Sequence, residues 1–329
     1  MTTYKEIRGT QIEAVSSDPS NPIEGQVWYN TTSNVLKGQA ATTAGAWSTG
    51  GDMNTGREYL AGAGSSNTAA IVFGGNTPPN TAVTEQYDGT SWTEVNDLND
   101  AKKEHGGAGN YTSALSIGGR SPSLTANTEL WNGTNWTEVN NLGAATRLMS
   151  SAGADNTAAI SAGGLAPNAT SVADTWNGTS WTEISNINTG RYQSGGAGTT
   201  TSALIFGGND DPGNRTNVVE YWNGSNWTEL ADMNNPRAPS IGHGADYEEV
   251  LVSGGGGPPT RYADVEQWNG STWTEVANLS VARAANASSG TTTSGLVSGG
   301  QAPSQSPAST GKTEEWSGST NLTKTISTD

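Results

Sequence analysis

The chain has 329 residues, including 44 glycines and 12 tryptophans, and it contains no cysteine, which excludes a disulfide framework, a thiolate metal site and a cysteine nucleophile. Its formal net charge of −16 argues against binding to a nucleic-acid backbone, which requires a basic surface. No stretch is apolar over the length of a membrane span, so membrane insertion is not expected.

Residues 1–45 differ in pattern from the rest and are interpreted as an N-terminal arm. The start, MTTYKEIRGTQIEAV, lacks the apolar run of a secretory signal peptide. Further along, QVWYNTTSNVLKG has two alternating segments on either side of a polar turn. This pattern predicts a β-hairpin that carries Trp28, Tyr29 and Leu36.

After the arm, the chain repeats a phrase in which two aromatic residues flank a turn, such as WNGTNWTEV. Asn-Gly and Asp-Gly favour tight hairpin turns, so each phrase predicts two antiparallel strands with facing aromatic rings. Upstream of each copy, a strand rich in Gly, Ala and Ser is followed by an apolar strand that ends in Gly-Gly. The copies begin at Tyr87, Trp131, Trp176, Trp222, Trp268 and, in a degenerate form, Trp316.

Each repeat therefore predicts four short strands. The copies are 44 to 48 residues apart, and four-stranded units at this spacing are typical of propeller blades. The double Gly followed by an aromatic residue and then Trp resembles the kelch motif over roughly residues 50–326. The resemblance implies an all-β fold, a six-bladed kelch-type β-propeller of four-stranded antiparallel blades, which we assign to residues 46–329.

The sixth phrase, WSGSTNLTK, lacks the Trp-Thr-Glu strand, so two segments compete to complete the last blade. One is the C-terminal tail, residues 322–328. The other is the segment around Trp47, which stands 45 residues before Trp92 and therefore keeps the register of the repeat. We favour the Trp47 segment, because it keeps the pattern and because a borrowed strand would leave no open sheet edge.

A basic residue precedes the first strand of every repeat, and an acid stands two residues before every first aromatic residue. The basic residues are Arg57, Lys102, Arg147, Arg191, Arg237 and Arg283. The acids are Glu85, Glu129, Asp174, Glu220, Glu266 and Glu314. Arg147 alone follows the preceding apolar residue by five positions instead of four.

These charges allow two interpretations. In kelch proteins the entry to the first strand faces the central pocket, so the six cations could form a rim that binds an anionic peptide or sugar acid. Alternatively, each cation forms a structural ion pair with one of the acids. The equal numbers of cations and acids favour the second interpretation.

The loops that follow Gly-Gly differ most between repeats, and variable loops on a repetitive frame predict a recognition surface. Representative positions are Pro78, Pro122, Asn168, Asp211 and Arg261. In the loop GNDDPGNR, Asp210 and Asp211 fit a polar turn better than a calcium site with oxygen ligands, although both interpretations stay open.

We predict no catalytic residue, no metal and no cofactor. The two histidines, His105 and His243, occupy different places in their repeats and do not make a metal triad. Nearly all the acids occupy repeat-equivalent positions, whereas catalytic groups normally break such symmetry. A glycosidase that uses two carboxylates is therefore disfavoured.

The N-terminal phrase NPIEGQVWYNTTSNVLKG is similar to a segment near the start of structural proteins of tailed phages, particularly marine ones, some of which also carry kelch-like repeats. This resemblance implies a virion protein, located in the extracellular particle without a signal peptide. The arm would bind other virion proteins, and the propeller would serve host attachment, as in a tail fibre, or capsid decoration.

A host-surface glycan or protein would then be the outer partner, and several copies of the chain could associate in the particle. Three alternatives stay open. The N-terminal hairpin could be a plug or an extra strand on the propeller instead of an attachment device. The protein could be an intracellular kelch scaffold that binds acidic peptides at the arginine-lined rim, or a tail enzyme that degrades polysaccharides.

Overall fold

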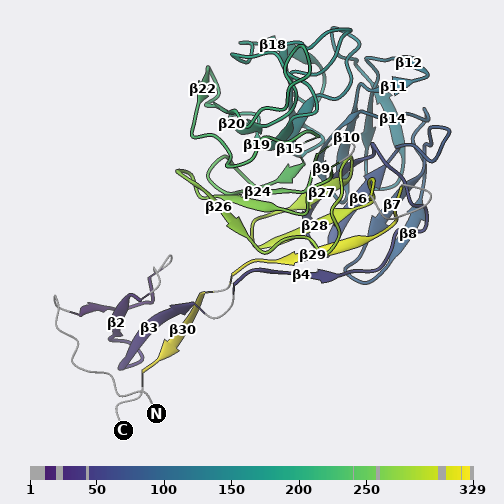
Figure 1. The fold of residues 1–329 in the computed structure, drawn as a ribbon. Coiled ribbons are helices and arrows are strands. Elements are labelled where there is room, and N and C mark those ends of the chain that lie inside the picture. The colour runs from purple at the N-terminus through teal and green to yellow at the C-terminus, as the bar shows by residue number, and fades with distance from the viewer. Residues whose placement is uncertain are drawn as a thin grey trace. The chain divides into compact units, whose positions relative to one another are not determined.

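The computed structural model describes residues 12–19, 25–41, 44–239, 241–256, 260–302, 309–319 and 321–326. Their regular structure consists entirely of β-strands (Figure 1), so this part of the chain holds no helix that could cross a membrane. The chain divides into two compact units, Ala46–Gly318 and a smaller one that combines Met1–Gly45 with Ser319–Asp329.

The larger unit contains six of the seven four-stranded sheets, and all six are antiparallel. The first sheet contains β5 (Ala61–Ser66), β6 (Ala69–Phe73), β7 (Thr84–Tyr87) and β8 (Trp92–Val95). The second contains β9 (Gly106–Asn110), β10 (Ser113–Ile117), β13 (Thr128–Trp131) and β14 (Trp136–Val139). The third contains β15 (Ser150–Asp155), β16 (Ala158–Ala162), β17 (Ala173–Trp176) and β18 (Trp181–Ile184).

The fourth sheet contains β19 (Gly195–Thr199), β20 (Ser202–Phe206), β21 (Val219–Trp222) and β22 (Trp227–Glu229). The fifth contains β23 (Gly242–His243), β24 (Val250–Ser253), β25 (Val265–Trp268) and β26 (Trp273–Val276). The sixth contains β27 (Ala287–Gly290), β28 (Ser294–Ser298), β29 (Thr313–Ser317) and β4 (Ala46–Thr49). A small ribbon of β11 (Arg120–Ser121) and β12 (Ser123–Leu124) lies in the loop after the Gly-Gly of the second sheet. Each repeat thus forms its sheet in the predicted strand order.

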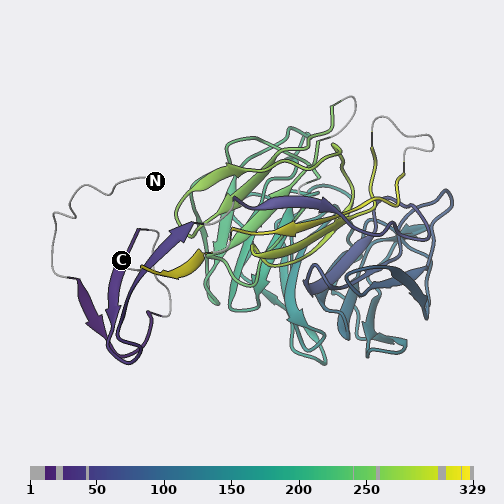
Figure 2. The ribbon, with the colours of Figure 1, turned by 90° about the horizontal axis from the view of Figure 1, so that it is seen from below.

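The sixth sheet is completed from the N-terminal side. β4 pairs antiparallel with β29, and Trp47 stands opposite Trp316. Figure 2 shows the purple β4 beside the yellow β29, although the two are far apart in the sequence. The favoured interpretation of Trp47 is therefore confirmed, and the tail does not serve as the outer strand of this sheet.

The predicted aromatic pairs join the third and fourth strands of all six sheets of the larger unit. Their ring centroids are 5.0–5.5 Å apart, and most of the rings are buried. The turn between them depends on Asn or Asp followed by Gly. In the second sheet, Asn132 accepts hydrogen bonds from the backbone N–H groups of Thr134 and Asn135, while Gly133 has a φ of 91°, which favours glycine.

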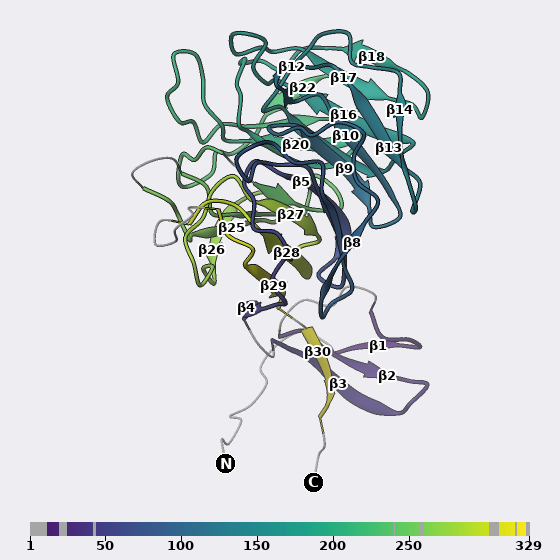
Figure 3. The same ribbon diagram turned by 90° about the vertical axis from the view of Figure 1, so that its right-hand side faces the viewer.

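The small residues of the first strands allow the six sheets to approach one another closely. A Cβ atom added to Gly107 on β9 would lie 2.7 Å from the carbonyl oxygen of Gly62 on β5. Each first strand contacts the first strand of the next sheet, and β27 contacts β5. In Figure 3, β27, β28, β29 and β4 follow one another outward from this inner position.

The fourth strands link each sheet to the one before it through a tryptophan N–H. Trp136 donates to Thr84 of the first sheet at 3.1 Å, and Trp92 of the first sheet donates to Thr313 of the sixth at 3.0 Å. The other four tryptophans at this position, Trp181, Trp227, Trp273 and Trp47, donate across the preceding boundary at 2.8–3.0 Å. This role of the repeated Trp was not predicted from the sequence.

The smaller unit contains the seventh sheet, in which β1 (Glu13–Val15) pairs parallel to β2 (Val27–Asn30), and β2 and β3 (Val35–Ala41) form the predicted hairpin. β30 (Asn321–Thr325) pairs with β3. The sequence pattern assigns residues 46–329 to the propeller, whereas Asn321–Thr325 lack the Trp-Thr-Glu pattern and pair with β3 of the arm. Residues 320 and 327–329 lie outside the described residues.

The candidate attachment residues of the arm differ in exposure. Trp28 is fully buried and donates to Asp18 at 3.0 Å, whereas Tyr29 is exposed and Leu36 is partly buried. Lys37 pairs with Asp18 at 2.6 Å. The hydrogen bonds from Lys37, Trp28 and Asn30 lower the pKa of Asp18 to about 2. Trp28 therefore stabilises the sheet, and Tyr29 is the candidate that a partner could reach.

Candidate functional site

Five of the six candidate cations form buried ion pairs within their own sheets. Arg191 lies 3.0 Å from Glu220, and neither side chain is exposed. The other four pairs are Arg57 with Glu85, Lys102 with Glu129, Arg237 with Glu266 and Arg283 with Glu314. In all five, the acid comes from the third strand of the same repeat, so the structural interpretation is confirmed for these residues.

Burial of these pairs leaves the five cations no surface that a ligand can reach. Burial lowers the pKa values of Arg57, Lys102, Arg191 and Arg283, and the paired glutamate opposes this effect in each case. The rim of cations suggested by the kelch resemblance is therefore wrong for five of the six positions. Their side chains are fully buried, and none of them lines the cavities around the axis.

Arg147 is the exception. Its side chain is 24% exposed and pairs with Glu104 of the second sheet at 2.5 Å. Thr146 occupies the position that the buried cations hold in the other repeats, four residues after the preceding apolar residue Leu142. Asp174, the candidate acid of the same repeat, does not pair with Arg147.

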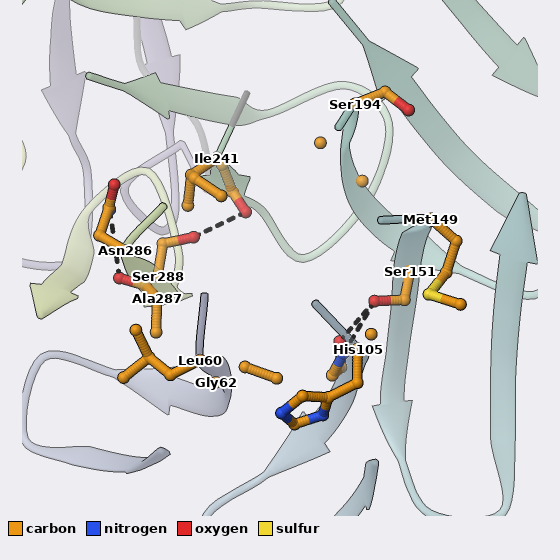
Figure 4. A pocket seen from close by; sticks show the side chains of 16 residues that line it. Leu60, Gly62, His105, Met149, Ser151, Ser194, Ile241, Asn286, Ala287 and Ser288 are labelled. Carbon is orange, nitrogen blue, oxygen red and sulfur yellow. Dashed lines mark hydrogen bonds between the residues drawn. The ribbon is translucent and has the colours of Figure 1, made fainter. Parts of the chain in front are cut away.

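The residues that do surround the axis come from the six first strands and from the positions directly before them. They line a cavity of about 120 Å³, to which the positions before the strands contribute Leu60, His105, Met149, Ser194, Ile241 and Asn286. Figure 4 shows these side chains around an open centre. Smaller cavities of about 80 and 90 Å³ adjoin this one and share lining residues with it. The axis is therefore a narrow channel with a mixed polar and apolar lining.

At one end of the channel lie the loops after Gly-Gly of the fourth, fifth and sixth sheets. A cavity of about 250 Å³ lies there, lined by residues of several sheets that include Tyr59, Gln193, Asn209, Arg215 and Gln301. Isolated β-bridges join the start of a repeat to the residue after its Gly-Gly, as Tyr192 is joined to Asn209. These bridges place the loops beside the channel entrance.

Polar contacts between neighbouring sheets hold this entrance together. Arg215 donates to the hydroxyl of Tyr262 at 3.3 Å, and its guanidinium carbon lies 5.9 Å from the centroid of that ring. Arg261 donates to Gln301. Amides, a phenol ring and guanidinium groups at one entrance can recognise hydroxyl and amide groups of a polar ligand.

The predicted loop positions lie in the loops of this end. Pro78, Pro122, Asn168 and Asp211 are exposed, and Arg261 is partly buried. The contact of Arg215 with Tyr262 could not be predicted from the sequence, because loops that differ between repeats show no pattern from which it could be inferred. Tyr59 lies before the first strand, at a position whose residue also differs between repeats. Among the described residues, no cluster of three or more His, Asp or Glu side chains could hold a metal ion.

The Asp210 loop is a polar turn. The Asp210 carboxylate accepts a hydrogen bond from the backbone N–H of Asn214 at 2.8 Å. This contact is of the kind that Asp side chains make in turns, and it supports the turn interpretation over the calcium loop.

Both histidines are buried, and this makes stability depend on pH. Burial lowers the pKa of His105 to about 3, with the charge of Lys102 as the next cause, and burial lowers the pKa of His243 to about 4. In the unfolded chain both would titrate near 6.5. The unfolded state therefore binds more protons below that pH, so the free energy of unfolding falls as the pH falls.

We predict that each histidine lowers the free energy of unfolding by about 2 kcal/mol between pH 7 and pH 5. Urea denaturation at the two pH values measures the loss. The variant H243Q should lose only about half as much between the two pH values. Equal pH dependence of the wild type and H243Q would contradict the assignment.

No family model matches the chain, and no curated protein matches it in sequence. Among solved structures, 324 chains match it in fold. One is YjhT, a kelch-like β-propeller protein, with a TM-score of 0.68 and 14% sequence identity over 83% of this chain and 99% of YjhT. At this identity the likeness shows a β-propeller fold and nothing about ligand or activity.

Proposed function

We propose that the chain is a non-enzymatic structural protein of a phage particle. In this proposal the six sheets of the larger unit are the blades of a closed, six-bladed kelch-type propeller, and the arm attaches it to other virion proteins. The propeller then contacts the host surface or decorates the particle through the loops after Gly-Gly.

The observation that carries this proposal is the contrast between the frame and the loops at one end. The frame repeats its ion pairs, aromatic pairs and tryptophan links from sheet to sheet. The loops after Gly-Gly differ in length and sequence, and those of the fourth, fifth and sixth sheets line one entrance. Recognition is the usual role of variable loops on a rigid frame.

The phenol rings, amides and guanidinium groups of the entrance suit a glycan or a polar peptide of a host surface. The N-terminal resemblance to tailed-phage proteins supports placement in a virion. The rival proposal, an intracellular scaffold that binds acidic peptides at an arginine rim, loses its main support because the cations it needs are mostly buried.

Mass spectrometry of purified phage particles, followed by labelling with an antibody against the propeller, tests this proposal. We expect the chain in stoichiometric amount at a defined place on intact particles. Its absence from washed particles would overturn the virion assignment. Incubation of the protein with host-surface glycans should release no new reducing ends, and their release would instead favour a tail enzyme.

A further inference from the structure

The five buried ion pairs define a recurring cation site. In the first sheet, Arg57 pairs with Glu85 and donates to the carbonyl oxygens of Gly74 at 2.9 Å and Val83 at 3.4 Å. Arg237 and Arg283 make the equivalent contacts in their own sheets. In these three sheets the site therefore combines one carboxylate with two carbonyl oxygens around the cation, and in the sheets of Lys102 and Arg191 the glutamate is the partner.

The second oxygen of each glutamate accepts a backbone N–H from the segment that precedes the cation. The donors are Asn54, Asn99, Asn188, Asn234 and Ser280, all at 2.7 Å. This contact fixes the carboxylate, so that its other oxygen faces the cation.

The third sheet keeps this site but lacks the cation. The carbonyl oxygen of Thr146 accepts the N–H of Gly119 at 2.8 Å, as that of Lys102 accepts the N–H of Gly75. Two residues later, Leu148 has a φ of 57°, as Tyr59 has 53° two residues after Arg57. These contacts show that Thr146 stands in the place of the cation.

Where the cation would lie, the third sheet has a cavity of about 330 Å³. Its lining includes Gly163 and Val172, which are equivalent to Gly74 and Val83 and supply the same pair of carbonyl groups. Gly143 and Ala144 also line the cavity and are exposed, so it opens to solvent there.

The acid in this cavity is Asp174, which is shorter than the glutamate of the other repeats by one methylene. None of the described residues forms a hydrogen bond or ion pair with its carboxylate, although the side chain is mostly buried. Burial raises the pKa of Asp174, and the charge of Glu183 on the adjacent strand raises it further. Both effects disfavour the ionised form of Asp174, and an external cation would stabilise that form by supplying the missing positive charge.

We propose that this cavity binds a guanidinium group from outside the chain, held by the Asp174 carboxylate and the carbonyl oxygens of Gly163 and Val172. Guanidinium is the favoured cation because four of the five equivalent sites hold arginine. Its planar array of N–H donors can serve a carboxylate and carbonyl oxygens together. The source is either an arginine side chain of a partner protein or a free guanidino compound.

Isothermal titration calorimetry with methylguanidinium at constant ionic strength tests the proposal. We expect saturable binding at one site of the full chain, and at least tenfold weaker binding by D174N. The matched control D232N, at an exposed position outside the loops after Gly-Gly and outside this cavity, should bind as the wild type does. Lack of saturable binding by the wild type, or unchanged binding by D174N, would overturn the proposal.

A second variant tests the same site without relying on loss of charge. T146R/D174E supplies the internal pair of the other five sheets, so it should fill the cavity, abolish methylguanidinium binding and raise the melting temperature. Undiminished binding by this variant in its folded form would contradict the proposal. If T146R/D174E does not fold, the titration of D174N still tests the proposal.

Two blocked tripeptides, Gly-Arg-Gly and Gly-Lys-Gly, distinguish the source of the group. Binding of the arginine peptide, with at least tenfold preference over the lysine peptide, supports an arginine of a partner protein. Binding of methylguanidinium alone supports a free guanidino compound. Equal binding of both tripeptides would contradict the preference for guanidinium.

Discussion

Replacement of Arg191 by methionine should lower the free energy of unfolding by roughly 3–5 kcal/mol, because it leaves Glu220 buried without its partner. Both side chains are fully buried and 3.0 Å apart, so solvent cannot replace the lost charge. Urea denaturation of R191M at neutral pH measures the effect.

Two controls separate the ion pair from general loss of packing. In R191M/E220Q the uncompensated charge is gone, so much of the stability should return. R147M removes the cation of the third repeat, whose side chain is 24% exposed, so water can replace part of the lost interaction and the variant should lose clearly less stability than R191M. Equal losses in R191M and R147M would contradict the account of the buried pairs.

Removal of β4 should destabilise the larger unit by roughly 3 kcal/mol, because it deletes the partly buried Trp47 and the backbone hydrogen bonds of β4 to β29. The deletion removes Trp47, whose ring lies 5.3 Å from that of Trp316 and whose N–H donates to the carbonyl oxygen of Ala277. It also exposes the edge of β29, which favours aggregation.

Two truncated chains measure this effect. Residues 46–318 keep β4 and should unfold cooperatively, whereas residues 51–318 lack it and should be less stable and prone to associate. Because both chains lack the smaller unit, a difference in stability between them reports the loss of β4. Equal denaturation midpoints for the two chains would show that β4 contributes nothing.

Much of the larger unit could be predicted from the sequence because its signals repeat. The facing aromatic rings follow from Asn-Gly flanked by Trp, the ion pairs follow from equal numbers of cations and acids, and Trp47 keeps the register of a fourth strand. Each of these depends on contacts within one repeat or between adjacent strands, and such contacts recur with the sequence period.

The rest depended on features that do not repeat. One additional residue before Arg147 moves that side chain out of the buried site, so the expectation that each cation pairs with one of the six acids is wrong for Arg147, which pairs with Glu104. The pairing of β30 with β3 joins two segments that lack the repeat pattern altogether. The contact of Arg215 with Tyr262 joins two different loops and depends on their individual conformations.

A cross-link between β4 and β29 tests the central claim that six sheets are arranged around one axis and that the N-terminal strand completes the last of them. Ser48 and Glu315 stand directly opposite each other, and the chain has no cysteine of its own. The variant S48C/E315C, treated with the thiol-bridging reagent dibromobimane, should become fluorescent, with one link joining the two strands. The control T182C/E315C, whose first cysteine lies in the third sheet, should not. Two free thiols in folded S48C/E315C would contradict the account.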